Sequence, residues 1–128
     1  MSSETPTIFI VDDEPLLAEM LSDFIKQENP NYTIKSFLTG EKCLESLDEL
    51  PSAIVLDYYL NSKVQDAANG IDILKEIKKR YKALPVIMLS SQESYGVASK
   101  TIMYGAVHYV IKGKDAFQEI SNLIRANV

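Results

Sequence analysis

The sequence predicts an α/β fold in which a parallel sheet is covered by helices on both faces. Five short, nearly continuous apolar runs are typical of strands buried on both sides, and they alternate with segments whose apolar residues repeat at helical spacing. Strict alternation of this kind implies parallel strands joined by right-handed helical crossovers. Because the chain has 128 residues, 46% of them hydrophobic, we expect a single compact domain over residues 1–128.

The first half of the chain predicts two strands and two helices. Residues 1–6 are small and polar, which favours a frayed, disordered tail. Strands are expected at residues 7–11 and 33–37, and Pro15 suits the first position of the helix between them. Apolar residues at helical spacing indicate the helices: Leu16, Leu17, Met20, Leu21, Phe24 and Ile25 in the first, and Cys43, Leu44, Leu47 and Leu50 in the second.

The second half predicts three more strands and three more helices. Pro51 closes the second helix, strands are expected at residues 53–56, 86–89 and 107–111, and a long polar loop runs from 58 to 70. The third helix is indicated by Ile71, Leu74, Ile77 and Tyr81, the weaker fourth by Tyr95, Val97, Ala98, Ile102 and Met103, and the last by Phe117, Ile120, Leu123 and Ile124. The chain therefore consists of five strand–helix units.

Charged and polar side chains stand at the carboxyl ends of four of the apolar runs. Asp12 and Asp13 follow the first run, Asp57 the third, Ser90 the fourth and Lys112 the fifth. The carboxyl ends of parallel strands meet at one edge of the sheet, where such folds bind ligands. Three carboxylates, a hydroxyl and an ammonium at that edge indicate an aspartate phosphorylation site with a divalent metal.

The chemistry of these groups supports the same interpretation. A carboxylate such as that of Asp57 can accept a phosphoryl group, and three clustered acids need a cation to offset their repulsion. Mg²⁺ suits the site, because it binds one or two carboxylates together with waters and phosphate oxygens. Phosphoryl transfer depends mainly on positioning and charge neutralisation, which Lys112 and the Ser90 hydroxyl can supply.

The motifs VDDEP, LDYYL, NGIDIL, LSS, YGA and YVIK resemble, in their order, the receiver domain of bacterial two-component response regulators, over nearly the whole chain. The resemblance implies a flavodoxin-like, doubly wound (βα)5 fold with a five-stranded parallel sheet of order 2-1-3-4-5. It also implies that Asp57 accepts phosphate from a sensor histidine kinase or a histidine phosphotransfer protein. The phosphorylated domain would then change a surface that binds a downstream protein, as a signalling domain and not as a turnover enzyme.

The resemblance assigns a metal site. Asp13, Asp57 and the Tyr59 carbonyl would bind Mg²⁺ directly, and Asp12 would act largely through water. Lys112 would bind the phosphoryl oxygens.

The resemblance also assigns a switch and two residues that control hydrolysis. Ser90 and Tyr109 would form the switch, the hydroxyl moving toward the phosphate and the aromatic ring rotating inward behind it. Tyr59 and Gln92 occupy positions that control access of water to the aspartyl phosphate. Both side chains are large, so we expect a longer phosphoryl lifetime than in variants with small residues there.

The sequence departs from the family pattern in two places. Receiver domains usually have proline after the active-site lysine, joined by a cis bond, whereas Lys112 is followed by Gly113. Gly70 comes 13 residues after Asp57 (70 − 57), a longer loop than is usual, and Asn61 stands where proline is common. We expect residues 62–69 to bulge from the rim of the site and to add partner specificity.

Structural interpretations compete with several of these roles. Asp12 and Asp13 could cap the first helix, a common use of aspartate, and Ser90 could cap the fourth. Tyr109 could be a core aromatic. His108 is expected to be an exposed strand residue and not a phosphodonor, and Cys43 to be part of the core.

Two other functions stay open. A phosphohydrolase similar to haloacid dehalogenases would also use an Asp nucleophile and Mg²⁺, but it has a second Asp where this chain has Tyr59. An unphosphorylated receiver-like scaffold is suggested by Gly113 and the long loop. The intact set of five residues argues against that scaffold: Asp12, Asp13, Asp57, Ser90 and Lys112.

Composition and charge exclude further classes. The formal charge of −5 and the pI near 4.8 argue against direct nucleic-acid binding, which needs a concentrated Lys/Arg surface. A single cysteine excludes an internal disulfide, and without a signal peptide or a membrane-spanning run we expect a soluble, cytoplasmic chain. Since no output segment follows Val128, both a stand-alone relay and a fragment of a larger regulator stay open.

Overall fold

The computed structural model describes residues 5–60, 69–91 and 95–128. The first half contains β1 (Thr7–Val11), α1 (Pro15–Glu28), β2 (Thr33–Phe37), α2 (Gly40–Glu45) and a 3₁₀ turn, η1 (Leu47–Glu49). The second half contains β3 (Ala53–Asp57), α3 (Gly70–Arg80), β4 (Val86–Ser90), α4 (Tyr95–Met103), β5 (His108–Ile111) and α5 (Ala116–Asn127). The described residues thus follow the predicted alternation of strands and helices.

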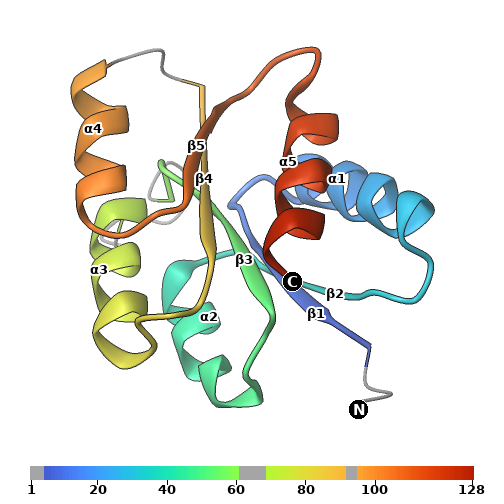
Figure 1. Ribbon diagram of the computed structural model, residues 1–128, viewed down its shortest axis with the longest axis horizontal. Coiled ribbons are helices and arrows are strands. Elements are labelled where there is room, and N and C mark those ends of the chain that lie inside the picture. Colours follow the sequence, from blue (N-terminus) through green and yellow to red (C-terminus); the bar gives the residue numbers. More distant parts are fainter. Residues whose placement is uncertain (1–4, 61–68, 92–94) are drawn as a thin grey trace.

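The five strands form one parallel sheet in the order β2-β1-β3-β4-β5 (Figure 1). This order confirms the predicted flavodoxin-like fold. The register pairs Val11 with Leu56 and Asp57 with Leu89, so the carboxyl ends of the central strands lie nearly level. The residues that follow β1, β3 and β5 therefore meet at one edge of the sheet.

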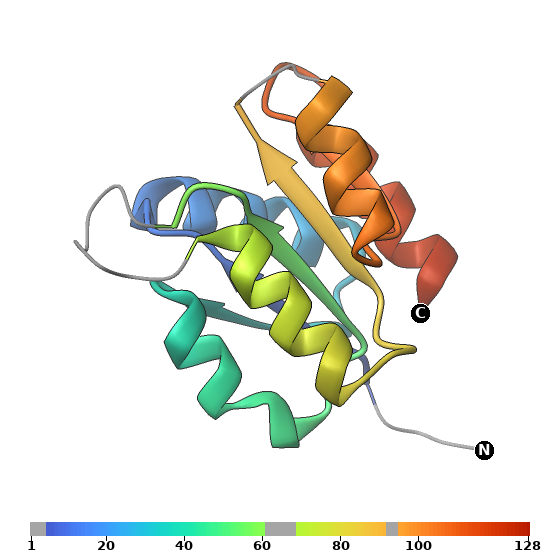
Figure 2. The ribbon, with the colours of Figure 1, turned by 90° about the vertical axis from the view of Figure 1, so that its left-hand side faces the viewer.

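The sheet separates two apolar cores, because side chains alternate between its faces along each strand. On one face, Ile8 and Ile10 of β1 pack with buried residues of α1 and α5, and on the other Phe9 and Val11 pack with residues of α2 and α3. Figure 2 shows α2 and α3 in front of the strands and α1 behind them. This arrangement is the predicted sheet with helices on both faces.

The second helix differs from the prediction. The apolar pattern extended it to Leu50, but α2 ends at Glu45 and the chain continues as the 3₁₀ turn η1. Leu50 has a left-handed backbone (φ 57°) and its side chain is 65% exposed. Pro51 disfavours helical backbone in the residue before it, which explains why the helix ends earlier than the hydrophobic spacing indicates.

The predicted apolar stripe of α1 is only partly buried. Leu21 and Ile25 lie in the core, whereas Leu16 is 71% and Met20 50% exposed.

No described helix has both the length and the apolar content to cross a membrane. Of the predicted frayed tail, residues 1–4 lie outside the described residues.

Candidate functional site

Three aspartates lie together at the carboxyl edge of the sheet. Asp12 and Asp13 follow β1, and Asp57 is the last residue of the neighbouring strand β3. Each offers a carboxylate oxygen, and these oxygens all lie within 4.8 Å of one another. All three side chains are buried, with at most 4% of their residue surface exposed. The structure therefore brings together the three acids that the sequence placed at strand ends.

The surrounding backbone holds Asp12 in place. Its N–H donates to the carbonyl of Phe37 at 3.0 Å, so pairing of β1 with β2 extends one residue beyond the strands. Its Oδ1 accepts a hydrogen bond from the N–H of Glu14 at 2.9 Å. Burial raises the pKa of Asp12, although the Glu14 N–H and the charge of Lys112 oppose that shift.

Asp57 is the least compensated acid of the cluster. Its Oδ1 is buried and has no hydrogen-bond partner of good geometry among the described residues. The Lys112 ammonium lies 3.4 Å from Oδ1, which is an ion-pair contact, and the Tyr59 N–H donates to the carboxylate. Burial and the charge of Asp12 outweigh these contacts and raise the pKa of Asp57 to about 7. A buried carboxylate oxygen that lacks a hydrogen bond and lies beside two more acids suits a cation or an incoming electrophile.

Lys112 reaches the acids from the end of β5. Its N–H donates to the carbonyl of Ser90 at 2.7 Å, which continues the β4–β5 pairing and aims the side chain at the cluster. Nζ lies 3.4 Å from Asp57 Oδ1, 3.7 Å from Glu14 Oε2 and 4.0 Å from Asp12 Oδ2. One ammonium is therefore shared by three carboxylates.

Ser90 and Tyr109 lie beside this cluster and contact each other. Ser90 is the last residue of β4 and is fully buried, while Tyr109 is half-buried on β5. Their side chains are hydrogen-bonded, a contact that opposes the rise that burial causes in the pKa of Tyr109. The electrostatic neighbours of Tyr109 include Tyr59 and Tyr58, whose own rings meet edge to face with centroids 4.8 Å apart. The two predicted switch residues are thus already in contact.

Comparison with known proteins identifies the family. The sequence model of the response regulator receiver domain matches residues 8–125. The chain belongs to this family. The receiver domain described above is therefore a component of two-component signalling, as its motifs indicated.

Known sequences and structures agree with this assignment. An NtrX-like response regulator of Rickettsia bellii is 35% identical over 106 residues, covering 82% of this chain and 21% of the relative. The transcriptional regulatory protein MalR of Bacillus subtilis is 31% identical, covering 82% of this chain and 43% of MalR. The receiver domain thus spans about a fifth of the first relative's length and less than half of the second's.

Solved receiver domains have the same fold. That of NtrX from Brucella abortus superposes with a TM-score of 0.79 at 26% identity, covering 93% of this chain and 96% of that one. The receiver domain of the Francisella response regulator 1452 superposes with a TM-score of 0.82 at 21% identity, covering 95% of each chain.

The structure decides some of the competing interpretations. The residue before α1 is Glu14, and no side chain there caps the helix, so neither Asp12 nor Asp13 is its N-cap. Ser90 does not cap α4, which begins at Tyr95. Helix capping therefore does not explain these three residues of the receiver domain.

His108 and Cys43 have the exposure and burial that were predicted, and the other positions lie outside the described residues. His108 is exposed, with Nε2 3.3 Å from Glu119 Oε2. Cys43 is buried in the core, and burial raises the pKa of its thiol to about 12. Gln92 lies outside the described residues, as do positions 62–68 of the long loop and Asn61.

Gly113, which follows Lys112 where receiver domains usually have proline, is accommodated without crowding. The peptide bonds of the described residues are all trans, including the bond between Lys112 and Gly113. A Cβ added to Gly113 would meet only the Ile111 carbonyl, at 3.9 Å.

The sequence analysis missed Gly70 as a positioning residue. Its N–H donates to the Tyr58 carbonyl at 2.8 Å. A Cβ here would lie 2.4 Å from the Asp57 carbonyl oxygen and 2.7 Å from Tyr58 Cα. Asn69 caps α3 through a 3.1 Å hydrogen bond from the Asp72 N–H, so the Asn-Gly pair in NGIDIL was the available signal. Only glycine lets α3 approach the backbone that follows Asp57 this closely.

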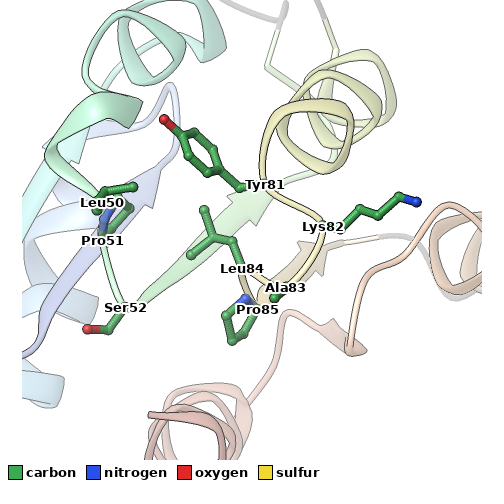
Figure 3. A pocket seen from close by; sticks show the side chains of 8 residues that line it. All are labelled: Leu50, Pro51, Ser52, Tyr81, Lys82, Ala83, Leu84 and Pro85. Atoms are coloured by element: carbon green, nitrogen blue, oxygen red, sulfur yellow. The ribbon is translucent and has the colours of Figure 1, made fainter.

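A separate hollow of about 440 Å³ lies at the amino ends of β3 and β4 (Figure 3). Leu50, Pro51, Tyr81, Leu84 and Pro85 supply most of its apolar lining. None of the strand-end acids, Lys112 or Ser90 lines it. The acid cluster and Lys112 therefore lie at the opposite end of the sheet.

Proposed function

We propose that this receiver domain accepts a phosphoryl group on Asp57. The observation that carries the proposal is the buried Oδ1 of Asp57, which has no hydrogen-bond partner among the described residues and lies 3.4 Å from the Lys112 ammonium and beside two further acids. In the reaction, a carboxylate oxygen of Asp57 forms a bond to phosphorus while the bond from phosphorus to the donor's imidazole nitrogen breaks. The nitrogen keeps the electron pair, and the product is an aspartyl phosphate.

The acid cluster fits Mg²⁺, which prefers carboxylate oxygens and water. Asp13, Asp57 and the Tyr59 carbonyl would hold the ion directly and Asp12 through water. When bound, it supplies positive charge that offsets the clustered carboxylates and the phosphoryl oxygens. The orphaned Oδ1 and the close approach of the three carboxylates support this assignment.

Lys112, Ser90 and Tyr109 would turn phosphorylation into a change of surface. Lys112 neutralises phosphoryl oxygens, and the Ser90 hydroxyl donates to one of them. To do so, Ser90 must give up its present hydrogen bond with Tyr109. Loss of that bond releases the Tyr109 ring to move inward, which shifts an existing equilibrium between two states.

The surface next to Tyr109 suits a protein partner. Four large apolar side chains of α4, β5 and the segment between them are exposed: Ile102 47%, Met103 73%, Val107 40% and Ile111 40%. Exposed apolar clusters of this kind favour protein contacts. The partners would be a sensor histidine kinase or histidine phosphotransfer protein as donor and a downstream protein as target. Neither nucleic acid nor membrane would be contacted directly, and the setting would be cytoplasmic.

A domain of this kind signals and does not turn over a substrate. The phosphohydrolase alternative needs a second acid two residues after the nucleophile, and Tyr59 carries no carboxylate. The aspartyl phosphate would be lost only slowly, by attack of water on phosphorus, which releases inorganic phosphate and regenerates Asp57.

Intact-mass measurement tests the proposal. The protein is incubated with acetyl phosphate, with and without Mg²⁺, beside Asp57→Asn. We expect one phosphoryl adduct that requires Mg²⁺ and is missing from the variant. An adduct of equal yield in Asp57→Asn would refute the assignment, and absence of both adduct and Mg²⁺ binding would favour the scaffold alternative.

A further inference from the structure

Glu14 contacts the active-site lysine from the solvent side. Its Oε2 lies 3.7 Å from Lys112 Nζ, and the side chains are 53% and 23% exposed respectively. The same ammonium lies 3.4 Å from Asp57 Oδ1 on its buried side. Lys112 therefore sits between an acid at the rim and the proposed phosphoacceptor.

Helix capping does not explain Glu14. It occupies the N-cap of α1 with extended backbone (φ −106°, ψ 100°), where Ser, Thr, Asp or Asn is preferred, and its side chain makes no capping hydrogen bond. Only its backbone serves the helix, because its carbonyl accepts from the Ala18 N–H at 3.1 Å. The carboxylate instead reaches Lys112.

Because the aspartates are buried, the position of the Lys112 ammonium affects how well their charges are offset. Asp12 and Asp57 are buried, while Glu14 is exposed to water that screens its charge. An ammonium on a flexible stem can move between such partners as their charges change. A phosphoryl group that arrives at Asp57 must compete with Glu14 for the same cation.

We propose that Glu14 is a positioning residue that shares the Lys112 ammonium with Asp57 before phosphorylation and competes with phosphoryl oxygens for it. The inference rests on the proposed phosphorylation of Asp57. When the Asp57 oxygen bonds to phosphorus and the donor's leaving atom departs with its electron pair, Lys112 exchanges Glu14 for a phosphoryl oxygen. Glu14 thereby limits the rate of phosphorylation in the resting domain.

Glu14→Gln tests this role through the rate of phosphorylation. The substitution keeps the size of the side chain and removes its charge. With acetyl phosphate and saturating Mg²⁺ we expect a rate about two- to fivefold higher than that of the wild type, the range set by an exposed ion pair. The increase should shrink at high salt, because the contact is exposed to solvent.

Glu19→Gln is the matched control. Glu19 is an exposed glutamate of α1, and none of the ion pairs of Lys112 includes it. It removes the same unit of charge from the same helix, so it measures the general effect of charge on an anionic donor. Equal acceleration in the two Gln variants would overturn the proposal.

A second readout does not depend on phosphorylation. The ¹⁵Nζ–¹³Cε NMR signal of Lys112, assigned by its loss in Lys112→Arg, is recorded in metal-free, unphosphorylated protein. We expect Glu14→Gln to shift this signal and Glu19→Gln to leave it in place. An unchanged Lys112 signal in Glu14→Gln would overturn the proposal even if the rate rose.

The phosphorylation rate and the Lys112 signal together distinguish failure of the proposed function from failure of the role of Glu14. If the wild-type domain takes up no phosphate, phosphorylation of Asp57 fails as the function and the competition proposed for Glu14 fails with it. If the wild type is phosphorylated and Glu14→Gln alters neither rate nor Lys112 signal, only the role of Glu14 fails.

Discussion

The negative charge of the Asp57 carboxylate is not fully offset by the groups around it. The carboxylate is buried at the end of β3, one of its oxygens has no hydrogen-bond partner among the described residues, and Asp12 adds a second negative charge. Lys112 is the cation drawn to it, and Glu14 and Asp12 share that ammonium. Binding of a proton or a metal ion would relieve this repulsion, which links the stability of the protein to the state of the proposed phosphoacceptor.

The pH dependence of stability follows from this imbalance. The pKa of Asp57 rises from 3.8 to about 7 on folding, so between these values the folded state binds more protons than the unfolded state. Unfolding free energy in EDTA should therefore fall as pH rises from about 4 to 7, by roughly 2 to 4 kcal/mol. The raised pKa of Asp12 acts in the same direction.

Urea denaturation at a series of pH values, in EDTA, measures this slope. Asp57→Asn should remove most of the dependence of unfolding free energy on pH, and it should be more stable than the wild type at pH 7.5. A variant with the wild-type slope would show that Asp57 is not the group responsible.

Tyr59 is expected to shield the aspartyl phosphate from water. Tyr59 comes two residues after Asp57, is 40% exposed and packs edge to face against Tyr58. Tyr59→Ala should shorten the phosphoryl lifetime several-fold, as should Gln92→Ala by the family pattern. Decay of the phosphorylated protein, followed by intact mass after removal of donor, measures both lifetimes. Unchanged decay in both variants would refute the shielding.

At the scale of elements, α3 and the segment after β3 depend on each other. The start of α3 presses on the backbone of Asp57 and Tyr58, and Tyr58 in turn donates its N–H to the Leu89 carbonyl of β4 at 2.9 Å. Gly70 permits this approach because it has no Cβ. The position of Asp57 is therefore set partly by a helix that begins 13 residues after it (70 − 57).

Gly70→Ala tests this dependence. Its methyl group would overlap the Asp57 carbonyl oxygen, so we expect a loss of about 1 to 3 kcal/mol of unfolding free energy and slower phosphorylation. Gly113→Ala is the control, because its Cβ has space and its backbone is not left-handed. Urea denaturation should find Gly113→Ala neutral or slightly stabilised, by up to about 1 kcal/mol. Equal losses in both variants would contradict the account of Gly70.

Hydrophobic patterning predicted the strands well because each is short, apolar and bounded by polar or turn residues. It misjudged the second helix, because Leu47 and Leu50 continue a helical spacing that Pro51 prevents the backbone from following. The closeness of the acids and Lys112 was predictable, because the carboxyl ends of parallel strands meet at one edge of the sheet. The contact of Glu14 with Lys112 and the close approach at Gly70 depend on tertiary distances that spacing along the chain does not contain.

At the scale of the whole molecule, the sheet connects the acid cluster to both cores. β1 and β3 carry the aspartates at their ends and contribute buried side chains to both faces. Repulsion among the aspartates therefore acts against the folded state as a whole, and a cation that binds only the folded site stabilises the whole domain.

Mg²⁺ should therefore raise the melting temperature at pH 7.5. For a dissociation constant of about 1 mM, 10 mM Mg²⁺ would contribute about 1.4 kcal/mol, which corresponds to a shift of roughly 3 to 6 °C for a chain of this size. Differential scanning calorimetry of the wild type and Asp13→Asn measures this shift. The variant should show little of it, and an equal shift in both proteins would place the cation elsewhere.

The most direct test of the central claim is to locate the phosphoryl group. The protein is treated with acetyl phosphate and Mg²⁺, the aspartyl phosphate is reduced with borohydride to homoserine, and the peptides are sequenced by mass spectrometry. We predict homoserine at position 57, dependent on Mg²⁺ and on donor. Homoserine at another aspartate, or none at position 57 in protein that carries a phosphoryl adduct, would contradict the account.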